Sequence, residues 1–153
     1  MHPNEDVVPR ELDAWERGDP EAVVACYTPR AVYHCPGNNP LSADYRGHEG
    51  IRDYYARCTQ LLGALDELEG SEHDLLVNDE HAVRLLEIRA RKGDQRAEWL
   101  HVAVYHFREV KLDGVWVLED PQPVADEFMT HVGQTLARTP ESGTRAIKRE
   151  VSR

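Results

Sequence analysis

Hydrophobic positions in the first half of the chain recur at helical spacing. Apolar residues at intervals of three and four predict three helices, over residues 8–15, 20–27 and 51–65. The second has a strong start signal, Asp19-Pro20-Glu21, with an N-cap Asp, Pro at the first position and an acid in the first turn. The apolar positions are Val8, Leu12 and Trp15, then Val23, Val24 and Tyr27, then Ile51, Tyr54, Tyr55, Cys58, Leu61, Leu62 and Leu65.

The second half of the chain has the pattern of consecutive strands. Turn signals separate apolar runs at residues 74–77, 82–90, 97–107 and 115–119, and a short helix is expected from Val124. One earlier strand, residues 31–35, lies between the second and third helices. Helices followed by consecutive strands indicate an α+β domain, with helices on one face of a curved antiparallel sheet.

The strand at residues 97–107 is apolar on both of its faces. Trp99, Ala103, Tyr105 and Phe107 share one face, and Leu100, Val102 and Val104 share the other. A strand of this kind fits a sheet that covers helices or a pocket on one side and meets another subunit on the other. The pattern therefore predicts a homodimer formed through the outer face of the sheet.

Charge and composition exclude several classes of partner. The formal net charge is −10, so the folded body should repel nucleic acid and acidic membrane surfaces. No apolar run approaches the roughly 18 residues of a membrane-spanning helix, and the charged, proline-containing start is unlike a signal peptide. The three cysteines lack a C-x-x-C spacing, which predicts free thiols in a reducing cytoplasm.

A chain of 153 residues predicts one domain. We place this domain at residues 1–132. Residues 133–153 contain five basic and two acidic side chains, a net charge of about +3, and few large apolar residues. This segment is expected to be a mobile basic tail.

Candidate chemistry centres on residues 31–50. The strand at 31–35 ends at Pro36-Gly37, and His34 lies just before the polar loop that follows. A rigid strand would hold this side chain while the loop gives access to it, and histidine titrates near neutral pH. His34 is therefore the candidate general base.

No sequence motif indicates a metal, a cofactor or a covalent nucleophile. His34 and Cys35 are adjacent, so they point to opposite faces of their strand and form neither a metal pair nor a nucleophile–base pair. The chain has no H-x-x-x-H, C-x-x-C, G-x-S-x-G, P-loop or G-x-G-x-x-G pattern. We expect no metal and no cofactor.

Three stretches carry a resemblance to a known family. They are Gly18-Asp19-Pro20-Glu21-Ala22-Val23-Val24 through Tyr27, then Ala31-Val32-Tyr33-His34-Cys35-Pro36-Gly37, then Tyr45-Arg46-Gly47-His48-Glu49-Gly50-Ile51. With the order of elements, they resemble the nuclear transport factor 2-like superfamily, in its branch of SnoaL-like polyketide cyclases and ketosteroid isomerases. The resemblance implies a cone, in which helices on the concave side of the sheet leave a deep apolar cavity.

The resemblance also implies roles for particular residues. His34 falls where ketosteroid isomerases carry their general-base Asp, but the oxyanion-hole positions fall near Glu11 and Ala103, which makes that isomerase mechanism a poor fit. SnoaL-like cyclases have a His on the long strand and an Asp at the end of the last strand. Here these would be His101, or alternatively His106, and Asp120.

Each candidate residue could instead have a purely structural role. His34 could bond the Asn38-Asn39 loop, His101 could be a buried neutral histidine, and Asp120 could cap the last helix. The expected aromatic wall of the cavity could equally be plain core; its members are Tyr33, Trp99, Tyr105 and Trp116.

The sequence thus predicts a cofactor-independent acid–base enzyme, of a cyclase, isomerase or lyase type, acting on a small hydrophobic carbonyl compound. His34 would move the proton, with His101 and Asp120 orienting it or stabilising the enolate. The alternative is a non-catalytic module of the same fold that binds a small ligand or serves dimerisation.

Overall fold

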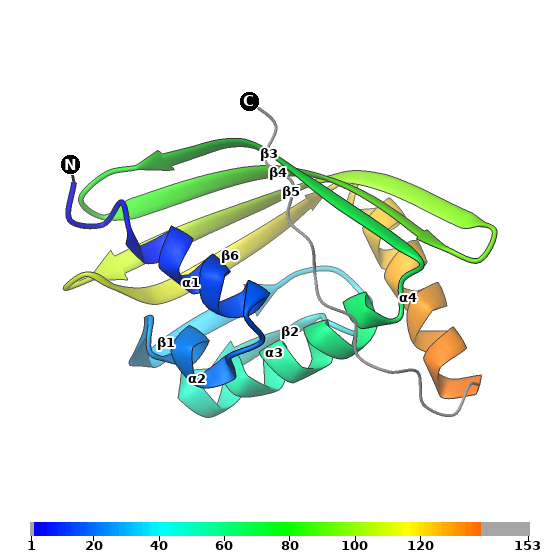
Figure 1. Cartoon of the computed structure of the whole chain (residues 1–153), viewed down its shortest axis with the longest axis horizontal. Helices are drawn as coiled ribbons and strands as arrows, with labels where there is room; N and C mark the ends of the chain where they lie inside the picture. Colours follow the sequence, from blue (N-terminus) through cyan, green and yellow to red (C-terminus); the bar gives the residue numbers. More distant parts are fainter. Residues whose placement is uncertain (1, 139–153) are drawn as a thin grey trace.

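A single curved sheet forms one layer of the molecule, and the helices lie along its concave side (Figure 1). The structure is a computed structural model and describes residues 2–138. The elements in chain order are α1 (Val7–Glu16), α2 (Pro20–Val24), β1 (Tyr27–Cys35), β2 (Ala43–Arg46), α3 (Gly47–Gly63), β3 (Glu67–Val77), β4 (His81–Lys92), β5 (Gln95–Arg108), β6 (Lys111–Asp120) and α4 (Gln122–Arg138). The predicted α+β class with helices on the concave side is confirmed.

The six strands lie in the order β2-β1-β6-β5-β4-β3. Four of the neighbouring pairs are antiparallel, but β1 runs parallel to β6. The sheet is therefore mixed, and the predicted antiparallel arrangement does not hold at this pair. Strands distant in sequence have no hairpin to force an antiparallel arrangement, so tertiary packing sets their direction.

Tertiary pairing also changed several predicted boundaries. Tyr27 has helical spacing in the sequence, but it begins β1, where it pairs with Leu112. The loop expected after Pro36-Gly37 contains β2, which pairs with the end of β1. The last helix is 17 residues long rather than short, and it continues through the first residues of the expected tail. Residues 139–153 of that tail lie outside the described part of the chain.

Local signals were reliable where neighbouring residues decide the structure. Asp19 caps α2 as predicted, because its side chain accepts a hydrogen bond of 3.1 Å from the backbone N–H of Ala22. Pro20 occupies the first turn of this helix. Gly18, which ends α1, has a φ of +69°, a conformation that favours glycine.

Side chains alternate between the two sides of the sheet as the long strand predicts. Trp99, Ala103, Tyr105 and Phe107 are buried on the inner side of β5, whereas its outward residues are only partly buried. The outer face also exposes two large apolar side chains of β6, Trp116 at 44% and Leu118 at 54%. The molecule therefore has one apolar face in its core and a second that faces solvent.

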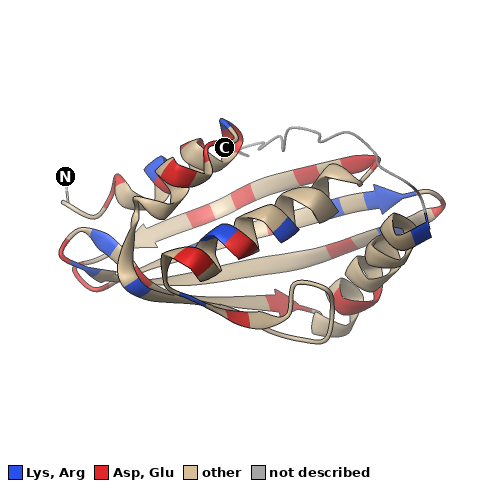
Figure 2. Cartoon of the chain, turned by 90° about the horizontal axis from the view of Figure 1, so that it is seen from below, with Lys and Arg blue, Asp and Glu red and all other residues tan. Residues whose placement is uncertain are grey.

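Charged residues of both signs are interspersed on the helical side of the molecule (Figure 2). Acidic and basic side chains follow one another along α3, for example Arg52, Asp53 and Arg57. None of the helices within residues 2–138 is both long and apolar enough to cross a membrane.

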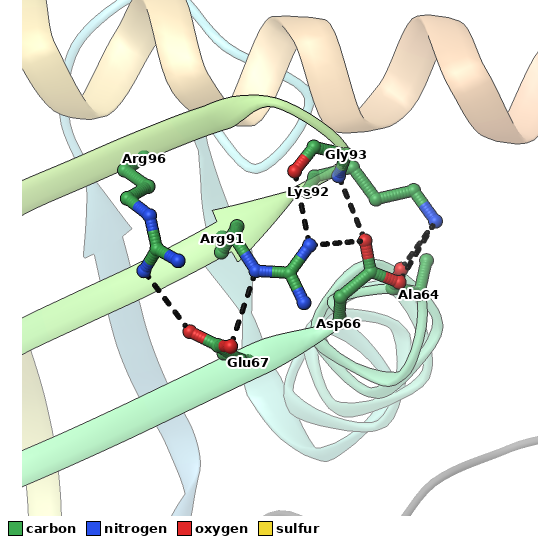
Figure 3. Close-up of polar contacts among 7 residues, drawn as sticks. All are labelled: Ala64, Asp66, Glu67, Arg91, Lys92, Gly93 and Arg96. Atoms are coloured by element: carbon green, nitrogen blue, oxygen red, sulfur yellow. Dashed lines mark hydrogen bonds and ion pairs between the residues drawn. The ribbon is translucent and has the colours of Figure 1, made fainter.

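A polar network attaches the β4–β5 hairpin to the end of α3 (Figure 3). Lys92 Nζ donates to the carbonyl of Ala64, at 2.7 Å, beyond the last turn of α3. Asp66 accepts from the backbone N–H of Gly93 at 2.7 Å and from Arg91 at 3.5 Å. These bonds hold the far end of the curved sheet against the helix layer.

We expect the substitution Asp66→Ala to lower the free energy of unfolding by about 1 kcal/mol, because it removes the partner of the Gly93 N–H. Urea unfolding would measure this change. The control is Glu98→Ala, because Glu98 forms an exposed 3.5 Å ion pair with Arg89 whose loss should change stability by less than about 0.5 kcal/mol. Equal effects of the two substitutions would contradict the role of the network.

Candidate active site

The inner face of the sheet and the helices α1 and α3 line a cavity of about 190 Å³. A smaller chamber of about 90 Å³ adjoins it and extends toward α4. The two share Trp99 and His101 of β5, Ile88 of β4, and three residues of α3. These shared α3 residues are Tyr54, Cys58 and Leu62. Most of the wall is apolar, so a ligand here would be largely desolvated.

A histidine–carboxyl pair lies where the two spaces meet. His101 of β5 is opposite Glu119 of β6, and His101 Nδ1 lies 2.8 Å from Glu119 Oε1. Both side chains are only 15% exposed. With Nδ1 bonded to the carboxyl group, Nε2 is the ring nitrogen left for a ligand. His101 is thus placed where the resemblance implied, but its partner is a residue that the sequence analysis missed.

A β-bulge explains why Glu119 rather than Asp120 is this partner. Phe107 pairs with Leu112 but His106 pairs with Gly114, so Asp113 is an extra residue in β6. One extra residue reverses the direction of every side chain after it. Glu119 consequently points inward and Asp120, opposite Leu100, is exposed. Asp120 lines neither cavity, so its predicted catalytic place was wrong.

His34 lies on the outer face of the sheet. Its Nδ1 is 2.8 Å from Asp44 Oδ1, and its ring stacks on Trp116 with 5.2 Å between centroids. Tyr33, its neighbour on β1, points inward instead, since adjacent strand residues face opposite sides. The structure therefore does not place His34 at the cavity, where a general base would have to be.

The aromatic residues divide between the same two sides. Tyr33, Trp99 and Tyr105 line the larger cavity, as expected of a substrate wall. Trp116 is on the outer face, so its predicted place in this wall was wrong. His106, the alternative to His101, also pairs on the outer side, where its ring lies 5.1 Å from that of His81.

The larger cavity has a second polar region, which the sequence analysis did not recognise as a site. Glu11 of α1 is buried and accepts from Trp15 Nε1 at 2.9 Å and from the Tyr27 hydroxyl at 2.8 Å. Arg84 of β4 is buried nearby and pairs through Nε with Glu72 at 2.7 Å. Burial raises the pKa of Glu11 despite its hydrogen bonds and the Arg84 charge. The available signal was periodicity, because both residues fall at apolar positions of their elements.

The thiols near the site are poor nucleophiles. All three cysteines are free, as predicted. Burial raises the pKa of Cys35, which lines the smaller chamber, and raises the pKa of Cys58 to about 12. Both groups therefore remain protonated at neutral pH. Within residues 2–138, no three His, Cys, Asp or Glu side chains are grouped so that they could hold a metal ion.

Comparison with known proteins agrees with the architecture. The profile of the SnoaL-like domain matches residues 8–119. The protein Bal32a from a soil-derived mobile gene cassette is 20% identical, with a TM-score of 0.72 over 83% of this chain and 96% of that one. An NTF2-like protein from Burkholderia xenovorans LB400 is 20% identical, with a TM-score of 0.66 over 84% of this chain and 95% of that one. A candidate SnoaL-like polyketide cyclase from Shewanella putrefaciens CN-32 is 13% identical, with a TM-score of 0.62 over 84% and 97%.

At these identities the structural likeness establishes the fold alone. No curated protein is similar enough in sequence to count as a relative. The domain profile, however, covers most of the chain. The fold is of the nuclear transport factor 2-like type, and the chain belongs to the family of SnoaL-like domains, which includes polyketide cyclases and isomerases.

We expect Glu11→Gln to stabilise the protein at neutral pH. The pKa of Glu11 in the folded protein lies above its ordinary value of 4.5. The contribution of this group to the free energy of unfolding of the wild type is therefore fully present below about pH 4.5, and it is lost as the pH rises through the folded-state pKa. Glutamine can still accept from Trp15 and Tyr27 but carries no charge. Its advantage should therefore be small near about pH 4 and grow toward about pH 8.

Urea unfolding across this pH range would measure the difference between variant and wild type. Glu16→Gln on the same helix is the control, because Glu16 is exposed. An advantage of the Glu11 variant that stays constant with pH would contradict the effect of burial on this group.

Proposed function

We propose that this protein is a cofactor-independent acid–base enzyme, of the cyclase or isomerase type, acting on a small hydrophobic carbonyl compound in its cavity. The observation that carries the proposal is the His101–Glu119 pair on the wall of a largely apolar cavity. A positioned imidazole in a water-poor site is suited to removing a proton from carbon next to a carbonyl group.

In this mechanism Glu119 holds the ring of His101 through Nδ1 and leaves Nε2 available to the substrate. Nε2 of His101 takes the proton from the substrate, and the Glu119 carboxylate stabilises the imidazolium that results. The same imidazolium then returns the proton to another atom of the substrate. The net reaction is a rearrangement or ring closure that needs no external redox partner.

Arg84, from the second polar region of the cavity, and the nearby Tyr105 would stabilise the negative charge that develops on the substrate oxygen. Arg84 and Tyr105 both line the larger cavity, and Arg84 uses Nε toward Glu72. Burial keeps Tyr105 protonated by raising its pKa, so its hydroxyl can donate. Donors fixed in a desolvated site stabilise an enolate much more than water does.

The cavity volume of about 190 Å³ suits a molecule of one or two rings. The same volume and apolar wall would also serve a non-catalytic module that only binds such a molecule. The two functions differ in one respect, because catalysis requires the free nitrogen of His101 and binding alone does not.

We expect the wild-type protein to accelerate deuterium exchange at the carbon next to the carbonyl of 2-tetralone, followed by proton NMR in heavy water. His101→Gln can keep a donor to Glu119 but has no base, so the rate should fall by about 100-fold or more. His34→Gln is the matched control and should leave the rate within about twofold, because His34 is on the outer face.

Two outcomes would count against catalysis by this pair. Undiminished exchange in the His101 variant would exclude it as the base. Binding of 2-tetralone without any exchange in the wild type would support the non-catalytic module.

We also propose that the outer face of the sheet binds a second copy of the chain. Apolar side chains are paired across three strands there, as Leu85–Val102–Leu118 and Val83–Val104–Trp116. Charges of both signs lie around them, including Asp44 and Arg46 of β2 and Glu87 and Arg89 of β4. Such a face is self-complementary, since a twofold axis can bring acidic and basic edges together around an apolar centre.

Sedimentation velocity should give the wild type twice the 17.5 kDa mass of one chain. Leu118→Glu should produce monomers, because it buries an unpaired charge in the contact. Ala56→Glu adds the same charge to an exposed site on α3 and should remain dimeric. A monomeric wild type would refute the proposed dimer.

A further inference from the structure

Two buried polar atoms beside His101 have no hydrogen-bond partner. Among residues 2–138, Trp99 Nε1 and Glu119 Oε2 are fully covered yet unbonded, and both residues line the smaller chamber. A third such atom, Thr59 Oγ1, is on α3 and lines neither cavity. Buried polar groups in folded proteins are nearly always bonded, so an unbonded donor and an unbonded acceptor on residues of one chamber wall indicate a ligand that bonds both.

The strand geometry makes Trp99 and Glu119 diagonal neighbours on the inner face, which is within reach of aromatic and long side chains. Trp99 and His101 are two residues apart on β5, so both point inward, and His101 is opposite Glu119 on β6. Glu119 uses Oε1 toward His101 and leaves Oε2 unused. Trp99 is 8% exposed, and its indole N–H is a donor only.

The two unpaired atoms, one donor and one acceptor, restrict the chemistry of the ligand that can bind them. A hydroxyl group can accept from Trp99 Nε1 and donate to Glu119 Oε2 through one oxygen atom. A carbonyl oxygen only accepts, an ammonium group only donates, and a carboxylate would face the charge of Glu119. Asn39 also lines the chamber, but its side chain already donates to Asp126 and accepts from the backbone N–H of Leu41.

The geometry points to a hydroxyl-binding subsite formed by Trp99 Nε1 and Glu119 Oε2. The substrate class would be a small, flat hydroxy-carbonyl compound, whose hydroxyl group enters the 90 Å³ chamber while its ring lies in the 190 Å³ cavity. This inference rests on the proposed function and narrows its substrate.

Two isosteric probes, p-cresol and p-xylene, would test the subsite, since they differ only by a hydroxyl in place of a methyl group. Isothermal titration would give the association constant of each probe for the wild type and for two variants. In Trp99→Phe the ratio of the p-cresol constant to the p-xylene constant should fall about fivefold or more, the change expected from one net hydrogen bond. Trp116→Phe, the matched change on the outer face, should leave this ratio unchanged.

A second measurement does not depend on the variant folding. In the wild type, p-cresol should move the indole N–H resonance of Trp99 downfield in a nitrogen–proton NMR spectrum, and p-xylene should not. Three outcomes would overturn the subsite. They are an unchanged affinity ratio in Trp99→Phe, an indole resonance that does not shift when p-cresol is added, and failure of both probes to bind. Deuterium exchange that depends on His101, together with an unchanged ratio, would reject the subsite and leave the proposed function standing.

Discussion

The bulge in the pairing of β5 with β6 is the constraint on which the site depends. Asp113 is the extra residue, and its side chain accepts from Thr28 at 2.6 Å and from Arg108 at 3.2 Å. Beyond it, Val115, Val117 and Glu119 all face inward, so the apolar packing of β6 and the position of its carboxyl group are decided together. In an unbulged strand the inward residues would be Trp116, Leu118 and Asp120.

The inner face combines an apolar core with a small number of costly polar groups. Tyr33 stacks on Tyr54 with 4.2 Å between ring centroids, which closes the sheet against α3. Around this contact the structure buries Glu11, Arg84 and the His101–Glu119 pair, although burial of ionisable groups opposes folding. Groups that cost stability and converge on one cavity are characteristic of functional sites.

The two sides of the sheet separate two kinds of interaction. The inner side holds the cavity with its histidine–carboxyl pair. The outer side carries a second pair, His34 with Asp44, beside the exposed ring of Trp116. Similar side chains therefore have different environments, one beneath the helices and the other on the exposed outer face. Membership of the SnoaL-like family is compatible with an enzyme and with a non-catalytic binding module, so it does not by itself identify a reaction.

Local patterns in the sequence determined the helices, the strands from β4 to β6, the capped start of α2 and the shared inner face of Trp99, His101 and Tyr105. These features depend on residues close together in the chain, whose spacing and turn chemistry are visible in the sequence. The face that His34 takes, the strand β2, the parallel pairing of β1 and the choice of Glu119 over Asp120 were decided only in the tertiary structure. They depend on pairing between distant segments and on one bulge, and because strand side chains alternate, a shift of a single residue moves a group from the cavity to the surface.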